Sequence, residues 1–331
     1  MINIGLITAK QAELRPNAWA VYDQTSNKRI TFFELDELVK KTANGLLGLG
    51  LKKGDRVSML SQNSVEFLAL FFACGRVGLV AHALNWRLSG EELVNIIENG
   101  QPKVVIAQGQ FQKVSKEIQK KVDSVDHWLE YDSASDHSFD ILIEKSPSSE
   151  PILTDDIGDD DPFFILYTGG TTGVSKGAMH THKSAYFGML NQTVAERVVP
   201  SDVYMLTGQM FHIPVLLAMN YTAHGCPIVL MNFDAELALN LIQEEKVSGF
   251  LGITTMLNWM MAVEGFEKYD LSSLRCVQYG GGPMPTRVIR EVLQKLPGGI
   301  IQGYGQTEGT TMTFLSQEDH VKAINGDHPE R

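Results

Sequence analysis

The sequence predicts an α/β protein built from two mostly parallel sheets, each with helices packed on it in layers. Strand-like and helix-like segments alternate over residues 1–131 and again after residue 162. This alternation is typical of parallel strands joined by helices. A hydrophobic content of 44% with 20% charged residues fits a globular protein with a sizeable core, and 331 residues fit about two domains.

Capping residues mark where helices of the first half begin. Thr31 and Glu34 form a capping box that opens an amphipathic segment ending near Gly48 and Gly50. Similar caps are found at 63–66, ahead of the apolar helix 67–73, and at 89–92. Apolar runs between these helices predict strands at 56–60, 79–81 and 104–107.

The composition changes to Asp, Ser, Pro and Glu between residues 132 and 161, where one short helix is expected at 139–143. The acidic run 155–161 lacks the spacing and terminal glutamate of an EF-hand calcium loop, which favours a solvated segment. We therefore expect a sheet-and-helix subdomain over 1–131, an acidic linker region over 132–161 and a second subdomain over 162–331.

The second subdomain repeats the alternation. Strands are predicted at 163–166, 203–206, 227–230, 250–253 and 275–279. Residues 236–242 have helical periodicity. The Met-rich segment 257–261 is predicted as helical core, because Met fills irregular gaps between packed elements.

The net charge of -11 argues against a nucleic-acid or anionic-membrane surface, since both require basic patches. Cys74, Cys226 and Cys276 are too few and too widely spaced for a disulfide framework or a Cys-x-x-Cys metal site. The sequence has no signal-peptide pattern and no apolar stretch of membrane-spanning length. These features predict a cytoplasmic location, and a homodimer is left open.

The segment 167–177 reads Tyr-Thr-Gly-Gly-Thr-Thr-Gly-Val-Ser-Lys-Gly and follows a predicted buried strand. Glycines allow backbone N–H groups to converge on a phosphate, and threonine hydroxyls and a lysine add donors and charge. The candidate phosphate-binding residues are Thr168, Gly169, Gly170, Thr171, Thr172, Gly173 and Lys176. The order Ser-Lys-Gly excludes a Walker A loop, and a flexible surface loop is the alternative.

Two further glycine-rich segments are candidates for ligand binding, and the first of them follows the predicted strand 275–279. Gly280, Gly281, Gly282 and Pro283 would expose bare backbone to a flat ligand, although a tight strand-to-helix turn needs the same residues. The second segment consists of Gln302, Gly303, Tyr304, Gly305, Gln306, Thr307 and Glu308.

The segment 167–177 resembles the phosphate-binding signature of the adenylate-forming superfamily, which includes acyl- and aryl-CoA synthetases, luciferases and peptide-synthetase adenylation domains. Gly169 and Ser175 replace the usual serine and proline. Tyr304, Gly305, Thr307 and Glu308 match the family's Tyr-Gly-x-Thr-Glu motif, and 85–89 matches Asn-Trp-Arg-Leu-Ser. The resemblance covers essentially the whole chain and implies the large N-terminal domain of the acyl-CoA synthetase-like fold.

The resemblance assigns roles to these residues. Tyr304 offers a flat face to adenine, with Gln302 and 280–283 beside it. Thr307 donates to the α-phosphate, Lys176 and its loop bind the leaving pyrophosphate, and Glu308 with Thr168 holds Mg²⁺. Phe211 and His212 line the carboxylate pocket, for which a packed histidine is the alternative. His180 and His182 are not in a zinc-binding array, and His182 is expected to begin a helix.

The implied reaction joins a carboxylic acid to ATP and then transfers the acyl group to coenzyme A. The apolar segments between Phe211 and Trp259 favour a fatty acid, and an aryl acid is the alternative. A carrier protein in place of coenzyme A, or nucleotide binding without turnover, are further alternatives. The mobile C-terminal domain with its catalytic lysine is expected beyond Arg331. The segment Asn-Gly-Asp at 325–327 resembles the family's ribose-binding Thr-Gly-Asp motif, but it follows Glu308 too closely and is interpreted as a surface turn. Without the C-terminal domain the chain is expected to have little activity alone.

Overall fold

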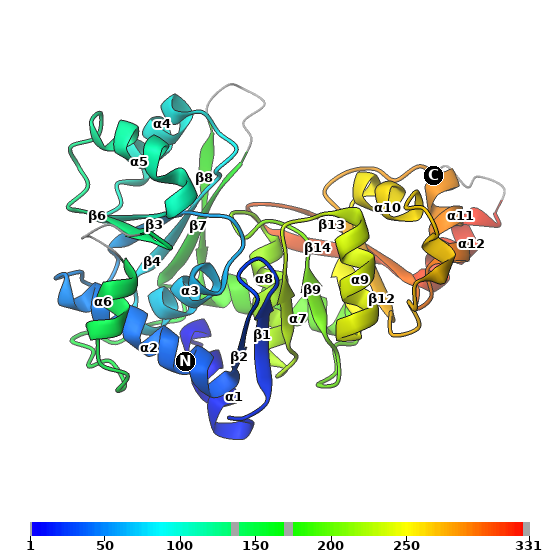
Figure 1. The fold of residues 1–331 in the computed structure, drawn as a ribbon, viewed down its shortest axis with the longest axis horizontal. Helices are drawn as coiled ribbons and strands as arrows, with labels where there is room; N and C mark the ends of the chain where they lie inside the picture. Colours follow the sequence, from blue (N-terminus) through cyan, green and yellow to red (C-terminus); the bar gives the residue numbers. More distant parts are fainter. Residues whose placement is uncertain (1, 134–138, 169–174, 327–331) are drawn as a thin grey trace. The chain divides into compact units, whose positions relative to one another are not determined.

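Two β-sheets with helices packed against them organise the chain, which confirms the predicted α/β class (Figure 1). The computed structural model describes residues 2–133, 139–168 and 175–326. The chain divides into two compact units. Unit 1 consists of Met1–Trp19, Ile30–Phe187 and Gln209–Val215, and unit 2 consists of Ala20–Arg29, Gly188–Gly208 and Leu216–Arg331.

A six-stranded sheet of order β6-β5-β3-β4-β7-β8 forms the centre of unit 1. Its strands are β3 (Arg56–Leu60), β4 (Val80–Leu84), β5 (Val104–Gln108), β6 (His127–Tyr131), β7 (Pro162–Thr168) and β8 (Lys176–Thr181). The pairs β3–β4, β3–β5, β4–β7 and β5–β6 are parallel, whereas β7–β8 is antiparallel. Every residue of β4 and β5 is buried, as expected for strands covered on both faces.

The helices of unit 1 are η1 (Ile4–Leu6), α1 (Ile7–Leu14), α2 (Phe32–Gly48), α3 (Val65–Val77), α4 (Gly90–Gly100), η2 (Gly109–Phe111), α5 (Gln112–Gln119) and α6 (Phe139–Lys145). Of these, α2, α3 and α4 begin at the predicted capping segments. In the capping box of α2, the Glu34 N–H donates to Thr31 Oγ1 at 3.2 Å and the Thr31 N–H donates to Glu34 Oε2 at 2.7 Å. Ser89 and Glu92 cap α4 in the same way, and Ser64 caps α3.

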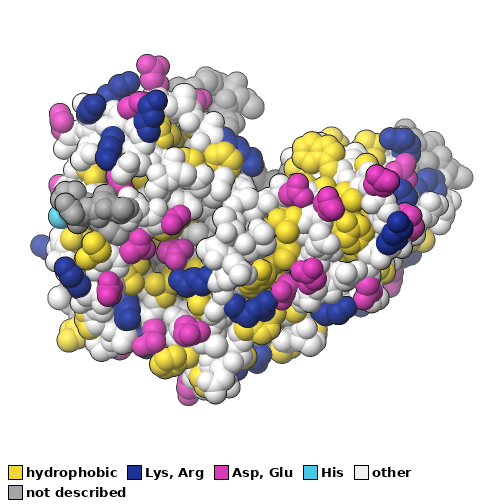
Figure 2. Space-filling model, in the orientation of Figure 1, with side chains coloured by type: hydrophobic (Ala, Val, Ile, Leu, Met, Phe, Trp, Pro, Cys, Tyr) yellow, Lys and Arg dark blue, Asp and Glu magenta, His cyan; other side chains and the backbone are white. Residues whose placement is uncertain are grey.

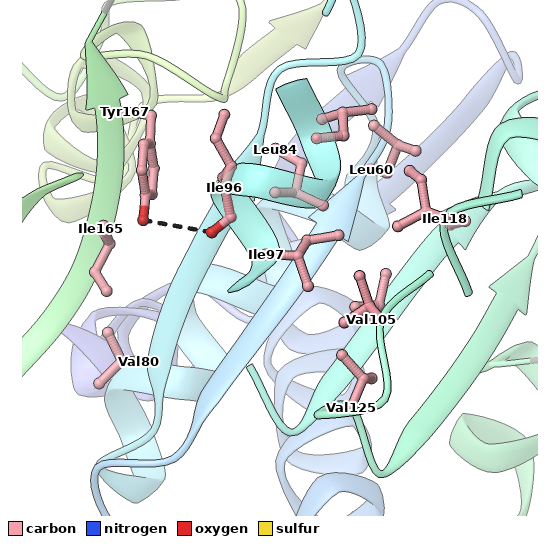
Figure 3. Packing of buried hydrophobic residues seen from close by; sticks show 13 residues of the cluster. Leu60, Val80, Leu84, Ile96, Ile97, Val105, Ile118, Val125, Ile165 and Tyr167 are labelled. Carbon is pink, nitrogen blue, oxygen red and sulfur yellow. Dashed lines mark hydrogen bonds between the residues drawn. The ribbon is translucent and has the colours of Figure 1, made fainter. Parts of the chain in front are cut away.

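One apolar cluster of unit 1 joins the sheet to α4 and α5 (Figure 3). Leu93, Ile96 and Ile97 lie on one face of α4 and pack on buried side chains of the sheet. Tyr167, at the end of β7, belongs to the same cluster and points toward α4 in Figure 3. The end of β7 is therefore fastened to the core of unit 1.

An eight-stranded sheet of order β14-β13-β12-β11-β9-β10-β1-β2 forms the centre of unit 2. Its strands are β1 (Trp19–Asp23), β2 (Lys28–Thr31), β9 (Tyr204–Leu206), β10 (Ile228–Leu230), β11 (Gly249–Leu251), β12 (Cys276–Gly280), β13 (Ile300–Gln306) and β14 (Thr310–Leu315). Neighbouring strands from β1 through β10, β9, β11 and β12 to β13 are parallel, and β13–β14 is antiparallel.

Two helices, α7 (His182–Glu196) and α8 (Pro214–Ala223), begin in unit 1 and continue in unit 2. The remaining helices of unit 2 are α9 (Ala235–Glu245), α10 (Thr254–Met261), η3 (Phe266–Lys268), α11 (Thr286–Lys295) and α12 (Gln317–Ile324). The prediction of helical core at 257–261 is confirmed in part. Leu257, Met260 and Met261 are buried, whereas Trp259 is 61% exposed.

The boundaries of the two compact units do not fall at residues 131 and 161, where the sequence patterns placed the ends of the first subdomain and of the linker region. The expected linker lies within unit 1, where Arg76 Nη2 contacts Glu150 Oε2 at 2.5 Å and Lys53 Nζ contacts Asp161 Oδ2 at 2.7 Å. Strand β7 also belongs to unit 1, because it pairs with β4. No helix among the described residues is long and apolar enough to cross a membrane.

The structure also corrects several element boundaries. Strand β11 ends at Leu251, because Ile253, placed in the strand by the sequence, is the N-cap residue of α10. The sequence patterns did not identify β1, β2, β6, β8, β13 or β14. Strands such as β8 and β14 lie at sheet edges and lack a continuous apolar run, so their polar residues resemble those of loops.

Candidate functional site

The hairpin formed by β7 and β8 carries both ends of the predicted phosphate loop. Thr168 pairs with Lys176 across the two strands, and Thr168 Oγ1 donates to the Lys176 carbonyl at 3.4 Å. Lys176 is exposed and Thr168 is half-buried, so both side chains are available near the mouth of the hairpin. Gly169, Gly170, Thr171, Thr172 and Gly173 lie outside the described residues.

Tyr167 anchors this hairpin to α4. Its hydroxyl donates to Asn99 Oδ1 at 2.5 Å. The same hydroxyl lies 3.5 Å from the Ile96 carbonyl oxygen, the contact drawn in Figure 3. The ring also covers Gly177, where a Cβ would lie 3.0 Å from Tyr167 Cζ. Burial raises the pKa of Tyr167 above its ordinary value, so the hydroxyl keeps its proton and acts as the donor.

A buried histidine lies beside Tyr167 in the core of unit 1. The ring of His82 is 5.3 Å from that of Tyr167, and His82 Nδ1 lies 2.6 Å from Ser58 Oγ. Burial, helped by the charge of Arg56, lowers the pKa of His82 to about 3. The histidine is therefore neutral near pH 7 and serves the packing under the hairpin.

The Phe211–His212 segment packs on the loop after β4 within unit 1. Trp86 Nε1 donates to Gln209 Oε1 at 3.0 Å, and the rings of Trp86 and Phe211 meet edge-to-face at 6.4 Å. The Arg87 guanidinium lies 5.9 Å from the centre of the Phe211 ring. Burial, and then the charge of Arg87, lowers the pKa of His212, which leaves a neutral imidazole near pH 7.

His180 and His182, which follow the predicted phosphate loop in the sequence, are packing residues. His180 stacks on Phe164 at 4.7 Å and His182 stacks on Phe163 at 4.9 Å. His182 begins α7, as predicted, and its Nδ1 accepts from the Ile4 N–H at 3.2 Å. Among the described residues no group of three or more His, Cys, Asp or Glu side chains could hold a metal ion.

The glycine-rich turn 280–283 joins β12 to α11 in unit 2, the predicted change from strand to helix. Gly281 has a φ of +73°, which favours glycine, and a Cβ on Gly280 would lie 2.4 Å from the Gly303 carbonyl oxygen. The glycines therefore allow β12 and β13 to approach closely. Through this pairing the structure brings Gly280 beside Gly303.

A histidine of α12 fixes the strand end before this turn. Tyr279 OH lies 2.8 Å from His320 Nε2, and His320 Nδ1 lies 2.7 Å from the Ser316 carbonyl. Burial lowers the pKa of His320, so the neutral ring donates from Nδ1 and accepts the Tyr279 hydroxyl at Nε2. The motifs gave no signal for His320, because it lies on a helix outside them.

The Tyr-Gly-x-Thr-Glu motif occupies the hairpin of β13 and β14. Tyr304, 65% exposed, lies near the end of β13, and Thr307 and Glu308 lie in the turn that follows. The Gly309 N–H closes this turn by donating to the Gln306 carbonyl at 3.1 Å. Glu308 is exposed and forms no ion pair with another residue in the described part of the chain. A single free carboxylate suits Mg²⁺, which takes one or two protein oxygens together with phosphates and waters.

Asn325 and Gly326, the described part of segment 325–327, lie at the end of helix α12. Asn325 is the C-cap residue of α12, and its N–H donates to the Val321 carbonyl at 3.2 Å. Asp327 lies outside the described residues. Asn325 and Gly326 therefore end a helix, close to the surface turn that the sequence predicted.

The family profile described as AMP-binding enzyme matches residues 8–327. The chain is 32% identical over 328 residues to the long-chain-fatty-acid–CoA ligase FadD13 of Mycobacterium tuberculosis, a match that covers 97% of this chain and 64% of that protein. It is 29% identical to a feruloyl-CoA synthase of Amycolatopsis sp., with 96% of this chain and 62% of that protein covered. The chain thus spans about two thirds or less of the length of these relatives.

The fold is also similar to a solved structure. The inhibitor-bound N-terminal domain of FACL13 from Mycobacterium tuberculosis aligns with a TM-score of 0.90 and 31% identity, covering 97% of this chain and 80% of that one. This likeness extends over both units, and the sequence motifs lie within the residues that the family profile matches. The chain belongs to the AMP-binding enzyme family and has the fold of the N-terminal domain of its acyl-CoA ligases.

Proposed function

We propose that this chain provides the nucleotide- and acid-binding domain of an AMP-forming acid–CoA ligase. The exposure of the motif side chains carries the proposal. Lys176 and Glu308 are exposed and Tyr304 is 65% exposed, and all three lie close to the turns of the β7–β8 and β13–β14 hairpins. A large aromatic ring exposed near a lone carboxylate is better explained by a ligand than by packing.

The reaction would begin with attack of a carboxylate oxygen on the α-phosphorus of ATP, which gives an acyl-adenylate and pyrophosphate. Lys176 would neutralise charge on the departing phosphates, and the Thr168 hydroxyl lies on the same hairpin. Acidic and basic side chains are interspersed on the face seen in Figure 2, so local donors such as Lys176 would hold the anion.

The second hairpin would bind the base, the α-phosphate and the metal. Tyr304 would stack on adenine beside the bare backbone of 280–283, where Gly303 adjoins Gly280. Thr307 would donate to the α-phosphate. Glu308 would hold Mg²⁺, which when bound neutralises phosphate charge.

The acid would lie against the Phe211–His212 segment. A carboxylate is already ionised at pH 7, so the first step requires no general base. The neutral His212 would contribute shape and one hydrogen bond, and the lowered pKa argues against a charge on it. Transfer of the acyl group to the thiol of coenzyme A would follow in the whole protein.

A fatty acid is the first candidate substrate, because the long-chain-fatty-acid–CoA ligase shares 32% of its residues over 328 positions. An aryl acid is the second candidate, since a feruloyl-CoA synthase shares 29%. Thermal-shift measurements with non-hydrolysable acyl- and aryl-adenylate mimics separate the two. We expect the midpoint to rise with tail length for alkyl mimics, and a larger rise with aryl mimics would contradict the fatty-acid assignment.

Binding of ATP to the 331-residue chain, measured by equilibrium dialysis with and without Mg²⁺, tests the nucleotide site. We expect weak binding that Mg²⁺ strengthens, and a loss of this gain in Glu308→Gln. Glu318→Gln, at an exposed acid of α12, is the matched control. Absence of ATP binding by the folded chain would overturn the proposal. Robust formation of acyl-CoA by this chain would contradict only the expectation of little activity alone.

A further inference from the structure

Thr310, two residues after Glu308, has an unusual backbone conformation. Its φ is +57° and its side chain is buried, with 6% exposed. A β-branched residue in the left-handed region is an outlier, because its Cβ substituents crowd the backbone at a cost of about 1–3 kcal/mol. Such a conformation persists where the surroundings hold the residue in place.

Gly188, in the interior of α7, is the neighbour that contacts the Thr310 side chain. A Cβ on Gly188 would lie 2.7 Å from Thr310 Oγ1 and 3.2 Å from Thr310 Cβ. Both residues belong to unit 2. Glycine inside a helix costs about 1 kcal/mol relative to alanine, so α7 carries a locally unfavourable residue at this contact.

The backbone of Thr310 closes the turn that carries Glu308. Thr310 pairs with Gln306 across the hairpin, and a Cβ on Gly305 would lie 1.9 Å from the Thr310 carbonyl oxygen. The register of β13 and β14 shifts between Tyr304 and Gly305 at the same place. The turn is therefore held on one side by Gly305 and, through Thr310, by helix α7 on the other.

We infer that Gly188 and Thr310 are positioning residues that set the place of the Glu308 carboxylate for the metal-bound nucleotide. Two residues that are each unfavourable locally meet at one contact beside the motif, and such conflicts are expected where function requires a fixed geometry. Neither residue touches the substrate, and both act through the turn 307–309. The inference rests on the proposed role of Glu308 in holding Mg²⁺.

The test measures how much Mg²⁺ strengthens ATP binding to variants of the 331-residue chain. Thr310→Gly accepts a φ of +57° and removes the side chain that contacts α7. Gly188→Ala inserts a methyl group into the contact. In both variants we expect the Mg²⁺-dependent gain to fall about tenfold, the lower end of what outer-shell changes cost a metal site, with ATP binding in EDTA unchanged.

Three controls make the result specific. Thr310→Ser keeps Oγ1 at the contact and should retain the gain. Gly48→Ala, in α2, should also retain it, because a Cβ there meets nothing within 4 Å. The double variant Gly188→Ala/Thr310→Gly should match Thr310→Gly alone, since both changes act through one contact.

The outcomes separate this inference from the proposed function. If Mg²⁺ strengthens ATP binding to the unaltered chain but Thr310→Gly keeps the full gain, the positioning role is wrong. Equal losses with Mg²⁺ and with EDTA also overturn it, because they indicate only general damage to the fold. No effect of Mg²⁺ on the unaltered chain would refute the metal role of Glu308 itself. If Gly188→Ala does not fold, the result for Thr310→Gly alone tests the positioning role.

Discussion

Each sheet ends in an antiparallel hairpin that carries one of the motifs, and the two hairpins are held by different means. The β7–β8 hairpin is fastened by a side chain, Tyr167, whose ring covers Gly177 and whose hydroxyl binds Asn99. The β13–β14 hairpin is fastened mainly by close backbone approaches, because a Cβ at Gly305 would lie 1.9 Å from the Thr310 carbonyl oxygen and a Cβ at Gly280 would lie 2.4 Å from the Gly303 carbonyl oxygen. Side chains can adjust to a substitution by changing rotamer, whereas a backbone atom cannot move alone, so the second hairpin should tolerate change less well.

Adding one methyl group to each hairpin gives the largest expected effect. A Cβ at Gly305 would lie 1.9 Å from a carbonyl oxygen, whereas a Cβ at Gly177 would lie 3.0 Å from side-chain atoms of Ile165 and Tyr167. We expect Gly305→Ala to cost about 3 kcal/mol and Gly177→Ala about 1 kcal/mol of unfolding free energy. Urea unfolding followed by circular dichroism measures both, and equal costs would contradict the proposed difference.

Local sequence patterns predicted several parts of the two hairpins and of the helices that support them. Strand β7 follows from its apolar run, the helix starts of α2 and α4 follow from capping boxes, and Lys176, Tyr304 and Glu308 follow from motif spacing. Each of these signals lies within a few neighbouring residues. The roles of the motif residues stay predictions.

The residues that hold the motif segments in place from elsewhere in the chain could not be predicted from the sequence. Asn99, Gly188 and His320 lie far along the chain from the residues that they contact, and no local pattern links the members of each pair. The left-handed backbone conformation of Thr310 also could not be predicted from the sequence, because threonine ordinarily avoids that region. A glycine inside α7 gives only a weak signal, since such residues have several uses.

The next largest effect concerns nucleotide binding by the first hairpin. Lys176 is exposed, so Lys176→Ala should leave the unfolding midpoint nearly unchanged while it weakens MgATP binding up to about a hundredfold. Lys10→Ala, at an exposed lysine of α1 in the same unit, is the control. Isothermal titration with MgATP measures the difference. An unfolded Lys176→Ala variant would instead indicate that the lysine supports the structure.

The two units should respond in opposite directions to pH. Burial, with the charge of Arg56, lowers the pKa of His82 in unit 1 to about 3, whereas burial raises the pKa of Glu196 in unit 2 to about 8. Protonation of His82 is favoured by unfolding, so unit 1 loses stability as the pH falls from about 6.5 toward 3. Ionisation of Glu196 is favoured by unfolding, so unit 2 loses stability as the pH rises from about 4.5 through 8.

Hydrogen exchange resolved by peptide measures this contrast, which should reach the order of 2 kcal/mol in each unit. Exchange rates at each pH must first be corrected for their intrinsic pH dependence. Glu196→Gln keeps an oxygen for Tyr221 and Gln192, which donate to the Glu196 carboxyl group at 3.0 and 3.1 Å, and should remove the alkaline loss in unit 2. His82→Asn should reduce the acid loss in unit 1. Parallel changes in both units would refute the assignment.

The smallest expected effect tests the side-chain anchor of the first hairpin. Tyr167→Phe removes only the hydroxyl and leaves the ring over Gly177, so we expect a cost of about 1 kcal/mol, the value of one hydrogen bond. Asn99 is exposed, and its oxygen can bind water once the hydroxyl is gone, which limits the loss. Asn99→Ala should cost a similar amount.

A double-mutant cycle decides whether these two residues act through each other. If the bond between the Tyr167 hydroxyl and Asn99 Oδ1 is the anchor, Tyr167→Phe/Asn99→Ala should cost little more than either single change. Additive costs would instead assign the anchoring to the ring and its contacts with Gly177. The first hairpin would then be held by steric contacts, as the second hairpin is. That result would reduce the expected difference between the two hairpins in how well they tolerate substitution.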